Sequence, residues 1–189
     1  MTSTPAGSRA GKRPALGVFR FLVALAAFSL TTPIAATMLA RLGLDRIVAA
    51  ADSIVEGRVE GVRSFWQGKQ IVTEVTLSVS HSLKGAAASR VVFIQIGGSV
   101  TSPVPVTMTV PGAPLHAVGD RGFYFLQPGA PGQKVLVGLS LGQILEKEDT
   151  SGSYVSYEGT RRTPGEFADE VIRLIAAQAP GRPDPGANR

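Results

Sequence analysis

The sequence of 189 residues contains no cysteine. This absence excludes disulfide bonds, a thiolate nucleophile and a cysteine-ligated zinc ion, because each of them needs the cysteine sulfur atom. It also excludes a lipoprotein anchor, which is attached to a cysteine. A protein without disulfide bonds must be stabilised by its hydrophobic core, and a chain of this length can bury a substantial one.

Histidine is almost as scarce, with His81 and His116 as the only two. A hydrolytic zinc site typically has three protein ligands, and here the set would be these two histidines and Asp120. Their spacing is not that of two histidines on one helix. We therefore predict no metal site and no cofactor, with His81 on the solvent-facing side of a strand end and His116 in the loop before Gly119.

Catalytic motifs are also lacking, since no serine lies in a G-x-S-x-G sequence. The stretch "GGSV" at residues 97–100 could offer backbone amides to an anion, but no helix is expected after it, which favours a strand turn. The acidic residues Glu146, Glu148 and Asp149 lack the spacing of a calcium loop, which favours a polar hairpin turn. We assign no catalytic residue, and an enzyme with a site assembled from scattered residues stays an alternative.

Charged residues make up only 17% of the sequence and hydrophobic residues 44%, which is typical of a globular chain. The net charge is +5, but much of it lies near the two ends of the chain. The terminal basic residues are Arg9, Lys12, Arg13, Arg20, Arg182 and Arg189. A nucleic-acid interface needs basic residues clustered on a folded face, and only Arg161 and Arg162 are adjacent elsewhere. We expect no nucleic-acid partner.

The N-terminal segment has the layout of a secretory signal. Basic residues end at Arg20, an apolar run follows over residues 21–30, and small residues surround Ala36. We predict a signal peptide over residues 1–36 and a periplasmic or secreted protein. The alternative is an uncleaved anchor over residues 21–40, which carry no acidic or basic residue before Arg41 and could span a bilayer, with the domain outside the cytoplasm.

Residues 42–178 are expected to form a single domain, followed by a disordered tail over residues 179–189, which are rich in proline and glycine. The stretch "DSIVEGRVEGV" at residues 52–62 alternates apolar or glycine positions with charged ones, as a strand does. A phosphate-binding loop instead needs its glycines at the turn into a helix. We interpret Gly57 and Gly61 as marking a bulge, a sharp coil of the strand or a close approach of two backbones.

Further strands are predicted from alternation and turn residues. Residues 71–79 alternate most clearly, after a hairpin turn around Gly68. Residues 90–98 are apolar on both faces, which suggests a central strand, and two prolines keep residues 104–110 at an edge. The remaining expected features are a strand at 123–126 after a tight turn at 119–120, and two or three strands within 134–159 with a polar turn at 149–152.

Helices are expected at both ends of the domain. The N-terminal one is short, and its apolar face carries Leu44, Ile47, Val48 and Ala51. The C-terminal one covers residues 163–178 and begins with the pattern of a capping box between Thr163 and Glu166. Its apolar stripe consists of Phe167, Val171, Leu174 and Ile175. We predict that this stripe docks onto the strands.

These elements predict a mainly β fold, a small antiparallel OB-like barrel of five to seven strands with a short N-terminal helix and a C-terminal amphipathic helix. A β-sandwich is the alternative. The stretches "AADSIVEGRVEGV", "IVTEVTLSVSHSLKG" and "VGDRGFYFL" resemble a group of uncharacterised bacterial exported proteins. More distantly they resemble the OB-like barrel of netrin modules and tissue inhibitors of metalloproteinases, over residues 50–143.

That resemblance implies the barrel and not the inhibitory mechanism, because tissue inhibitors act through an N-terminal cysteine that this chain lacks. OB-like barrels bind ligands on one face, often with exposed aromatic residues. We predict a partner-binding surface around Phe65 and Trp66 in the first hairpin turn, flanked by Arg58 and Lys69. One of the two rings could instead fold back onto the barrel end.

The expected function is an exported, non-catalytic binding or interaction module with an envelope or extracellular protein or polymer as its partner. The alternatives are a periplasmic hydrolase whose site has no recognised motif and an inhibitor of a secreted metalloprotease.

Overall fold

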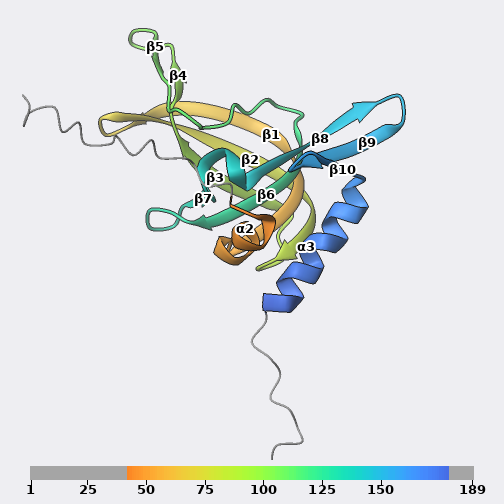
Figure 1. Ribbon diagram of the computed structural model, residues 1–189. Helices are drawn as coiled ribbons and strands as arrows, with labels where there is room; N and C mark the ends of the chain where they lie inside the picture. The colour runs from red at the N-terminus through yellow and green to blue at the C-terminus, as the bar shows by residue number, and fades with distance from the viewer. Residues whose placement is uncertain (1–41, 179–189) are drawn as a thin grey trace, which may run out of the picture. The chain divides into compact units, whose positions relative to one another are not determined.

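The computed structural model describes residues 42–178, which form a mainly β, antiparallel structure with two helices (Figure 1). The expected signal segment and C-terminal tail lie outside the described residues. No helix within the described part of the chain is long and apolar enough to cross a membrane.

The helices and strands follow the order expected from the sequence, with more and shorter strands in the second half. Their bounds are α2 (Leu44–Ala50), β1 (Ser53–Gln67), β2 (Gln70–Lys84), β3 (Arg90–Ile96), β4 (Gly98–Val100), β5 (Val106–Met108), β6 (Arg121–Pro128), β7 (Lys134–Leu136), the short 3-10 helix η1 (Leu139–Gly142), β8 (Gln143–Asp149), β9 (Gly152–Tyr157), β10 (Thr160–Arg162) and α3 (Pro164–Gln178).

Eight strands form one sheet in the order β10-β9-β8-β6-β1-β2-β3, with β7 paired to β6. Strands β3 and β7 lie next to each other without pairing, so β3, β2, β1, β6 and β7 curl into a barrel that hydrogen bonds do not close. Strands β4 and β5 form a separate two-stranded arm that projects from the sheet (Figure 1). The predicted mainly β class with two flanking helices is confirmed, and a fully closed barrel is not formed.

Strand β6 is the central strand, because residues 122–126 are buried on both faces. Phe123 and Phe125 point to the side covered by the helices, which we call the outer face. Tyr124 and Leu126 point into the curled sheet, which we call the inner face.

Residues 90–98 were predicted to be a central strand, and this prediction is wrong. β3 pairs only with β2, and the outward-facing side chains of Val92 and Ile96 are exposed, so an apolar run on both faces did not require a neighbour on both edges.

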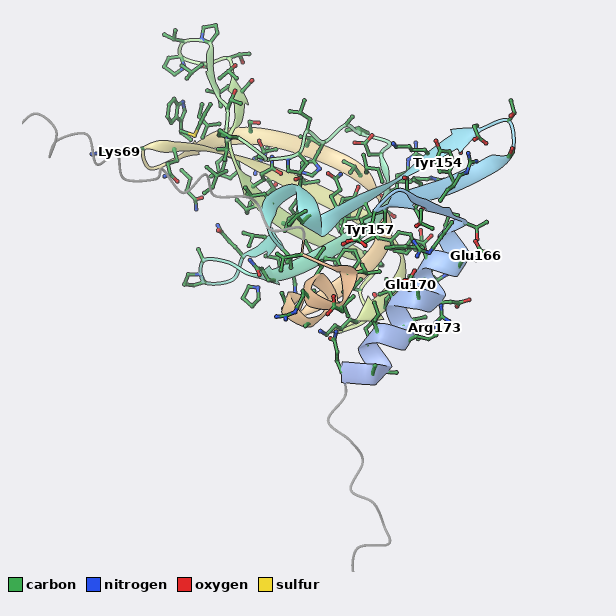
Figure 2. All side chains as sticks on the ribbon, in the orientation of Figure 1. Lys69, Tyr154, Tyr157, Glu166, Glu170 and Arg173 are labelled. Carbon is green, nitrogen blue, oxygen red and sulfur yellow. The ribbon has the colours of Figure 1, made fainter. Side chains whose placement is uncertain are left out.

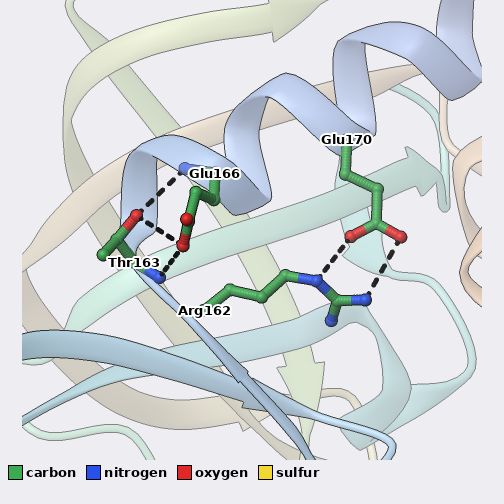
Figure 3. A network of polar contacts seen from close by, with 4 residues as sticks. All are labelled: Arg162, Thr163, Glu166 and Glu170. Atoms are coloured by element: carbon green, nitrogen blue, oxygen red, sulfur yellow. Dashed lines mark hydrogen bonds and ion pairs between the residues drawn. The ribbon is translucent and has the colours of Figure 1, made fainter.

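The two helices cover part of the outer face. Leu44, Ile47 and Val48 of α2 pack in the same cluster as Phe167 and Val171 of α3. The predicted docking of the C-terminal helix is therefore confirmed. Its capping box is also formed (Figure 3), since the Glu166 amide donates to Thr163 Oγ1 at 3.2 Å and the Thr163 amide donates to Glu166 Oε2 at 2.9 Å.

The opening stretch is a strand, and both of its glycines have the predicted roles. A side chain at Gly57 would place its Cβ 2.5 Å from the backbone oxygen of Ser78 on β2, so only glycine allows this close approach. The β1–β2 register shifts between Val59 and Gly61, which marks a bulge. The polar turn at residues 149–152 is confirmed. In "GGSV" the chain turns out of β3 at Gly97 and Gly98, which both have a positive φ, and Gly98–Val100 forms β4 of the separate arm.

Candidate functional site

Phe65 and Trp66 lie in β1 and not in the hairpin turn, which consists of Gly68 and Lys69 alone. Neighbouring residues of a strand point to opposite faces. Trp66 pairs with Ile71 and Phe65 pairs with Val72, so the two aromatic rings belong to different faces of the hairpin. The predicted surface that combines both rings is therefore wrong, and each ring must be considered separately.

The bulge in β1 decides which ring faces inward. Val59 points to the inner face, and a regular alternation from there would also put Phe65 on the inner face. The extra residue between Val59 and Gly61 reverses the alternation, and Val62 then lies opposite Val75 of the inner core. Two and four residues further on, Ser64 and Trp66 point to the same inner face.

The inner face of the hairpin forms one wall of a pocket of about 250 Å³, which we call the inner-face pocket. The other walls come from β3, from the β4–β5 arm and from the loop before Gly119. The main lining residues from these four segments are Val62, Ser64, Thr73, Gln95, Met108 and Leu115. The pocket thus continues the inner core outward along the hairpin.

The pocket has a polar wall whose hydroxyl groups are satisfied internally. Thr73 Oγ1 donates to the backbone oxygen of Gly97 at 2.7 Å. Ser64 Oγ, 2.8 Å away, therefore donates to Thr73 Oγ1. A Cβ at Gly98 would collide with both hydroxyl groups, so this glycine lets the arm lie directly against the hairpin. These contacts fix the arm as the second wall of the pocket.

His116 lies at the pocket in a neutral form. Its Nε2 donates to Gln95 Oε1 at 2.8 Å, and its Nδ1 accepts from the amide of Gln143 at 3.3 Å. The ring also packs edge-on against Phe93, with centroids 5.3 Å apart. Burial lowers the pKa of His116 to about 4, and the opposing effect of the Asp120 carboxylate is smaller. The half-buried ring was predicted to lie in a loop, but its amide partners were not foreseen.

The inner core next to His116 holds a second perturbed group. Tyr124 is fully buried, and its hydroxyl has no hydrogen-bond partner among the described residues. Burial raises the pKa of Tyr124 to about 12. The Gln143 side chain favours the phenolate slightly, but its amide is not placed to hydrogen-bond the hydroxyl. The phenol therefore stays protonated at neutral pH.

Large apolar side chains are exposed around the mouth of the inner-face pocket. Leu115 is 94% exposed and Val62 is 37% exposed, although both line the pocket. Trp66 is 45% exposed and lies two residues beyond Ser64, about 6.6 Å along the same face at about 3.3 Å per residue. Leu115 was not foreseen, because nothing in a loop sequence tells whether its leucine is buried.

The remaining residues of the predicted surface are spread over the sheet. Phe65 is covered on the outer face by the Arg63 guanidinium, 5.1 Å from the ring centroid. Lys69 lies at the far end of the hairpin (Figure 2). Arg58 is eight residues before Trp66 on the outer face, opposite Arg121 of β6. The prediction that Arg58 flanks the aromatic pair is wrong.

The two histidines lie on opposite faces of the sheet. His81 is exposed on the outer face, with Nδ1 2.9 Å from Glu56 Oε2. Asp120 accepts a hydrogen bond from the amide of Ala117 and so caps its own turn. No group of three possible metal ligands is found within residues 42–178.

Asp149 of the acidic set and the two adjacent arginines, all considered from the sequence, form local ion pairs. Asp149 lies at the β8–β9 turn and pairs with Arg161. The side chain of Arg162 reaches Glu170 of α3, with Nε 2.9 Å from Oε2 (Figure 3). The two adjacent arginines are thus engaged by different carboxylates and do not form a basic patch.

Comparison with known proteins identifies no relative. No family model, no curated protein and no solved structure matches the chain.

Proposed function

We propose that this protein is a non-catalytic binding module that holds its partner at the inner-face pocket and the adjoining Trp66. One observation carries the proposal: exposed apolar side chains from the hairpin and from the loop before Gly119 lie at one pocket. Exposed apolar groups that are contiguous, with a polar surround, are typical of interaction sites. The hydroxyl, amide and imidazole groups of the pocket wall hold one another in place by hydrogen bonds, so the wall presents a fixed surface to the partner.

The partner we propose is a segment of an extracytoplasmic protein or polymer that presents an apolar group. Export rests on the N-terminal signal pattern, and the pocket of about 250 Å³ suits a group of side-chain size. The hydrolase alternative receives less support, because His81 and His116 lie on opposite faces and each is engaged by a different neighbour.

Two variants and one matched control test this proposal. Trp66→Ala and Leu115→Ser remove exposed apolar area at the pocket, whereas Phe65→Ala removes an aromatic ring from the other face of the same strand. We expect the first two to weaken binding of a partner recovered from the cell envelope by at least tenfold, as interface residues that contribute over 1.4 kcal/mol do. Phe65→Ala should bind like the original protein.

The folded state of each variant is checked by circular dichroism, because a binding loss in an unfolded variant says nothing about the surface. Equal recovery of the partner by all three folded variants would remove the inner-face pocket from consideration. Loss with Phe65→Ala alone would move the binding surface to the outer face.

A further inference from the structure

A row of three charged side chains crosses the outer face on three adjacent strands. Arg58 of β1 lies directly opposite Arg121 of β6. In the β6–β8 register Gly122 lies opposite Leu145, and one further step brings Arg121 level with Glu146 of β8. The row therefore consists of Arg58 on β1, Arg121 on β6 and Glu146 on β8. It lies on the opposite face of the sheet from the inner-face pocket.

These three residues line a polar groove of about 490 Å³, which we call the outer-face groove. The same three residues line an adjoining hollow beside the turn at Gly119. The ideal Cβ position of Gly119 lies 3.5 Å from a terminal nitrogen of Arg58, which places this guanidinium beside that turn. Glu56 lines both the groove and the neighbouring hollow beside α3, so the depression continues across the face.

The other charged side chains of the groove already have partners. Glu56 lies 2.9 Å from His81, and Glu60 lies 3.0 Å from Arg90. Among the described residues, Arg58, Arg121 and Glu146 form no ion pair. They are thus the charged groups of the groove that are free to meet a ligand.

The pairing of the two arginines is unfavourable without a ligand. Like charges directly opposite each other on neighbouring strands destabilise a sheet, and Arg58 and Arg121 are such a pair. Burial raises the pKa of Glu146, the Glu56 carboxylate raises it further, and Arg121 lowers it. Arg121 therefore acts on Glu146 through space without contacting it, which leaves a gap between opposite charges.

We propose that the outer-face groove binds a small zwitterionic ligand, one that carries a carboxylate and an ammonium group, such as the two ends of a short peptide. The carboxylate lies between the guanidinium groups of Arg58 and Arg121, which can each donate two parallel hydrogen bonds to it. The ammonium group lies against Glu146. A ligand with negative charge alone would be opposed by Glu146, Glu56 and Glu60 in the same groove.

The test is a nuclear magnetic resonance titration of the full chain, labelled with nitrogen-15, with four compounds at one ionic strength. Glycine and diglycine carry both charges at different separations, acetate carries only the carboxylate, and ethylammonium carries only the ammonium group. We expect glycine or diglycine to shift the signals of Arg58, Arg121 and Glu146 in a saturable way. Acetate and ethylammonium should bind at least tenfold more weakly.

Charge-removing variants show whether the row is the binding site. Arg121→Gln and Glu146→Gln should each weaken binding of the zwitterion at least tenfold. Arg173→Gln is the matched control, because Arg173 is an exposed arginine of α3 (Figure 2) outside the groove. Absence of saturable shifts with both zwitterions, or acetate binding as tightly as diglycine, would overturn the proposal. Trp66→Ala should leave these shifts unchanged, so this result is independent of the inner-face pocket.

Discussion

One extra residue in β1 determines which aromatic side chain faces the inner-face pocket. The bulge between Val59 and Gly61 shifts the register with β2, and the side chains beyond it exchange faces. As a result Trp66, and not Phe65, extends the apolar mouth of the pocket. The glycine at position 61 lies against no backbone atom, since its nearest neighbour is a Thr76 side-chain atom 3.8 Å from the ideal Cβ position.

The two glycines of β1 should respond differently to substitution by alanine. At Gly57 the new Cβ would meet the Ser78 backbone oxygen at 2.5 Å, and a backbone atom within a sheet cannot move away at low cost. We expect Gly57→Ala to lower the free energy of unfolding by about 1–3 kcal/mol, as overpacking does. Gly61→Ala should change it by less than about 0.5 kcal/mol, because the site is open.

Urea denaturation of both variants measures these changes. Equal destabilisation by the two substitutions would contradict the distinction between a close approach at Gly57 and an open bulge at Gly61.

His116 should make the stability of the protein depend on pH. Its pKa is about 4 in the folded protein and near 6.5 in the unfolded chain, so the unfolded chain binds more protons between these values. Stability is then fully present above about pH 6.5 and falls as the pH is lowered towards 4. The expected loss is roughly 2 kcal/mol, after a discount for the part of the ring that solvent screens.

Urea denaturation at pH 4.5 and pH 7 tests this expectation with two variants. His116→Gln should remove most of the histidine contribution to the pH dependence, and the control His81→Gln should retain it, because His81 is exposed. A pKa of 6 or above for His116 in a titration of the imidazole signals would contradict the account.

At the level of whole elements, helix α3 is part of the folded core. Phe167 and Val171 are fully buried, and the Phe167 ring packs edge-on against Phe123 with centroids 4.9 Å apart. Ile172 belongs to the same helix but is 47% exposed. The helix therefore stabilises the sheet through one stripe of its surface.

This difference predicts the effect of two substitutions in one helix. Phe167→Ala should lower the free energy of unfolding by about 3–5 kcal/mol, because it leaves a cavity between α3 and β6. Ile172→Ala should cost less than about 1 kcal/mol. Thermal unfolding and the binding of a dye for apolar surfaces measure both effects. If Phe167→Ala melts like the original protein, the helix does not contribute to the core as described.

The sequence predicted those elements whose signals are local. The capping box of α3 depends on two residues three positions apart, and the turn at residues 149–152 on a short polar stretch. The neighbours of β3 could not be predicted in this way, because an apolar strand has the same pattern whether another strand or solvent lies at its edge. For the same reason, the sequence did not show that β3 and β7 approach without pairing.

The sequence predicted the candidate sites less well than it predicted the fold. Trp66 was recognised as a surface aromatic residue, but its face depends on a bulge whose exact position has no unique sequence signal. Leu115 and Gln95 come next to the hairpin only through tertiary structure. Arg58 was assigned to the wrong neighbours, because its register partner Arg121 is distant in the sequence and becomes adjacent only when β6 pairs with β1.

In the molecule as a whole, the two faces of one sheet carry surfaces of different character, one mainly apolar and one charged. Strand β6 contributes to both hydrophobic cores, with Phe123 and Phe125 outward and Tyr124 and Leu126 inward. Beyond the inner core the sheet offers an apolar pocket, and beyond the outer core it offers a charged groove. The two faces can therefore be tested separately by changes in alternate residues of the same strand.

Site-specific photo-cross-linking along β1 tests whether the partner binds the inner face. A photoreactive phenylalanine analogue is placed in turn at Val62, Arg63, Phe65 and Trp66, and folding of each protein is checked by circular dichroism. If the partner binds the inner face, cross-links form from positions 62 and 66, on that face, and few form from positions 63 and 65. Cross-links mainly from positions 63 and 65, or equally from all four, would contradict it.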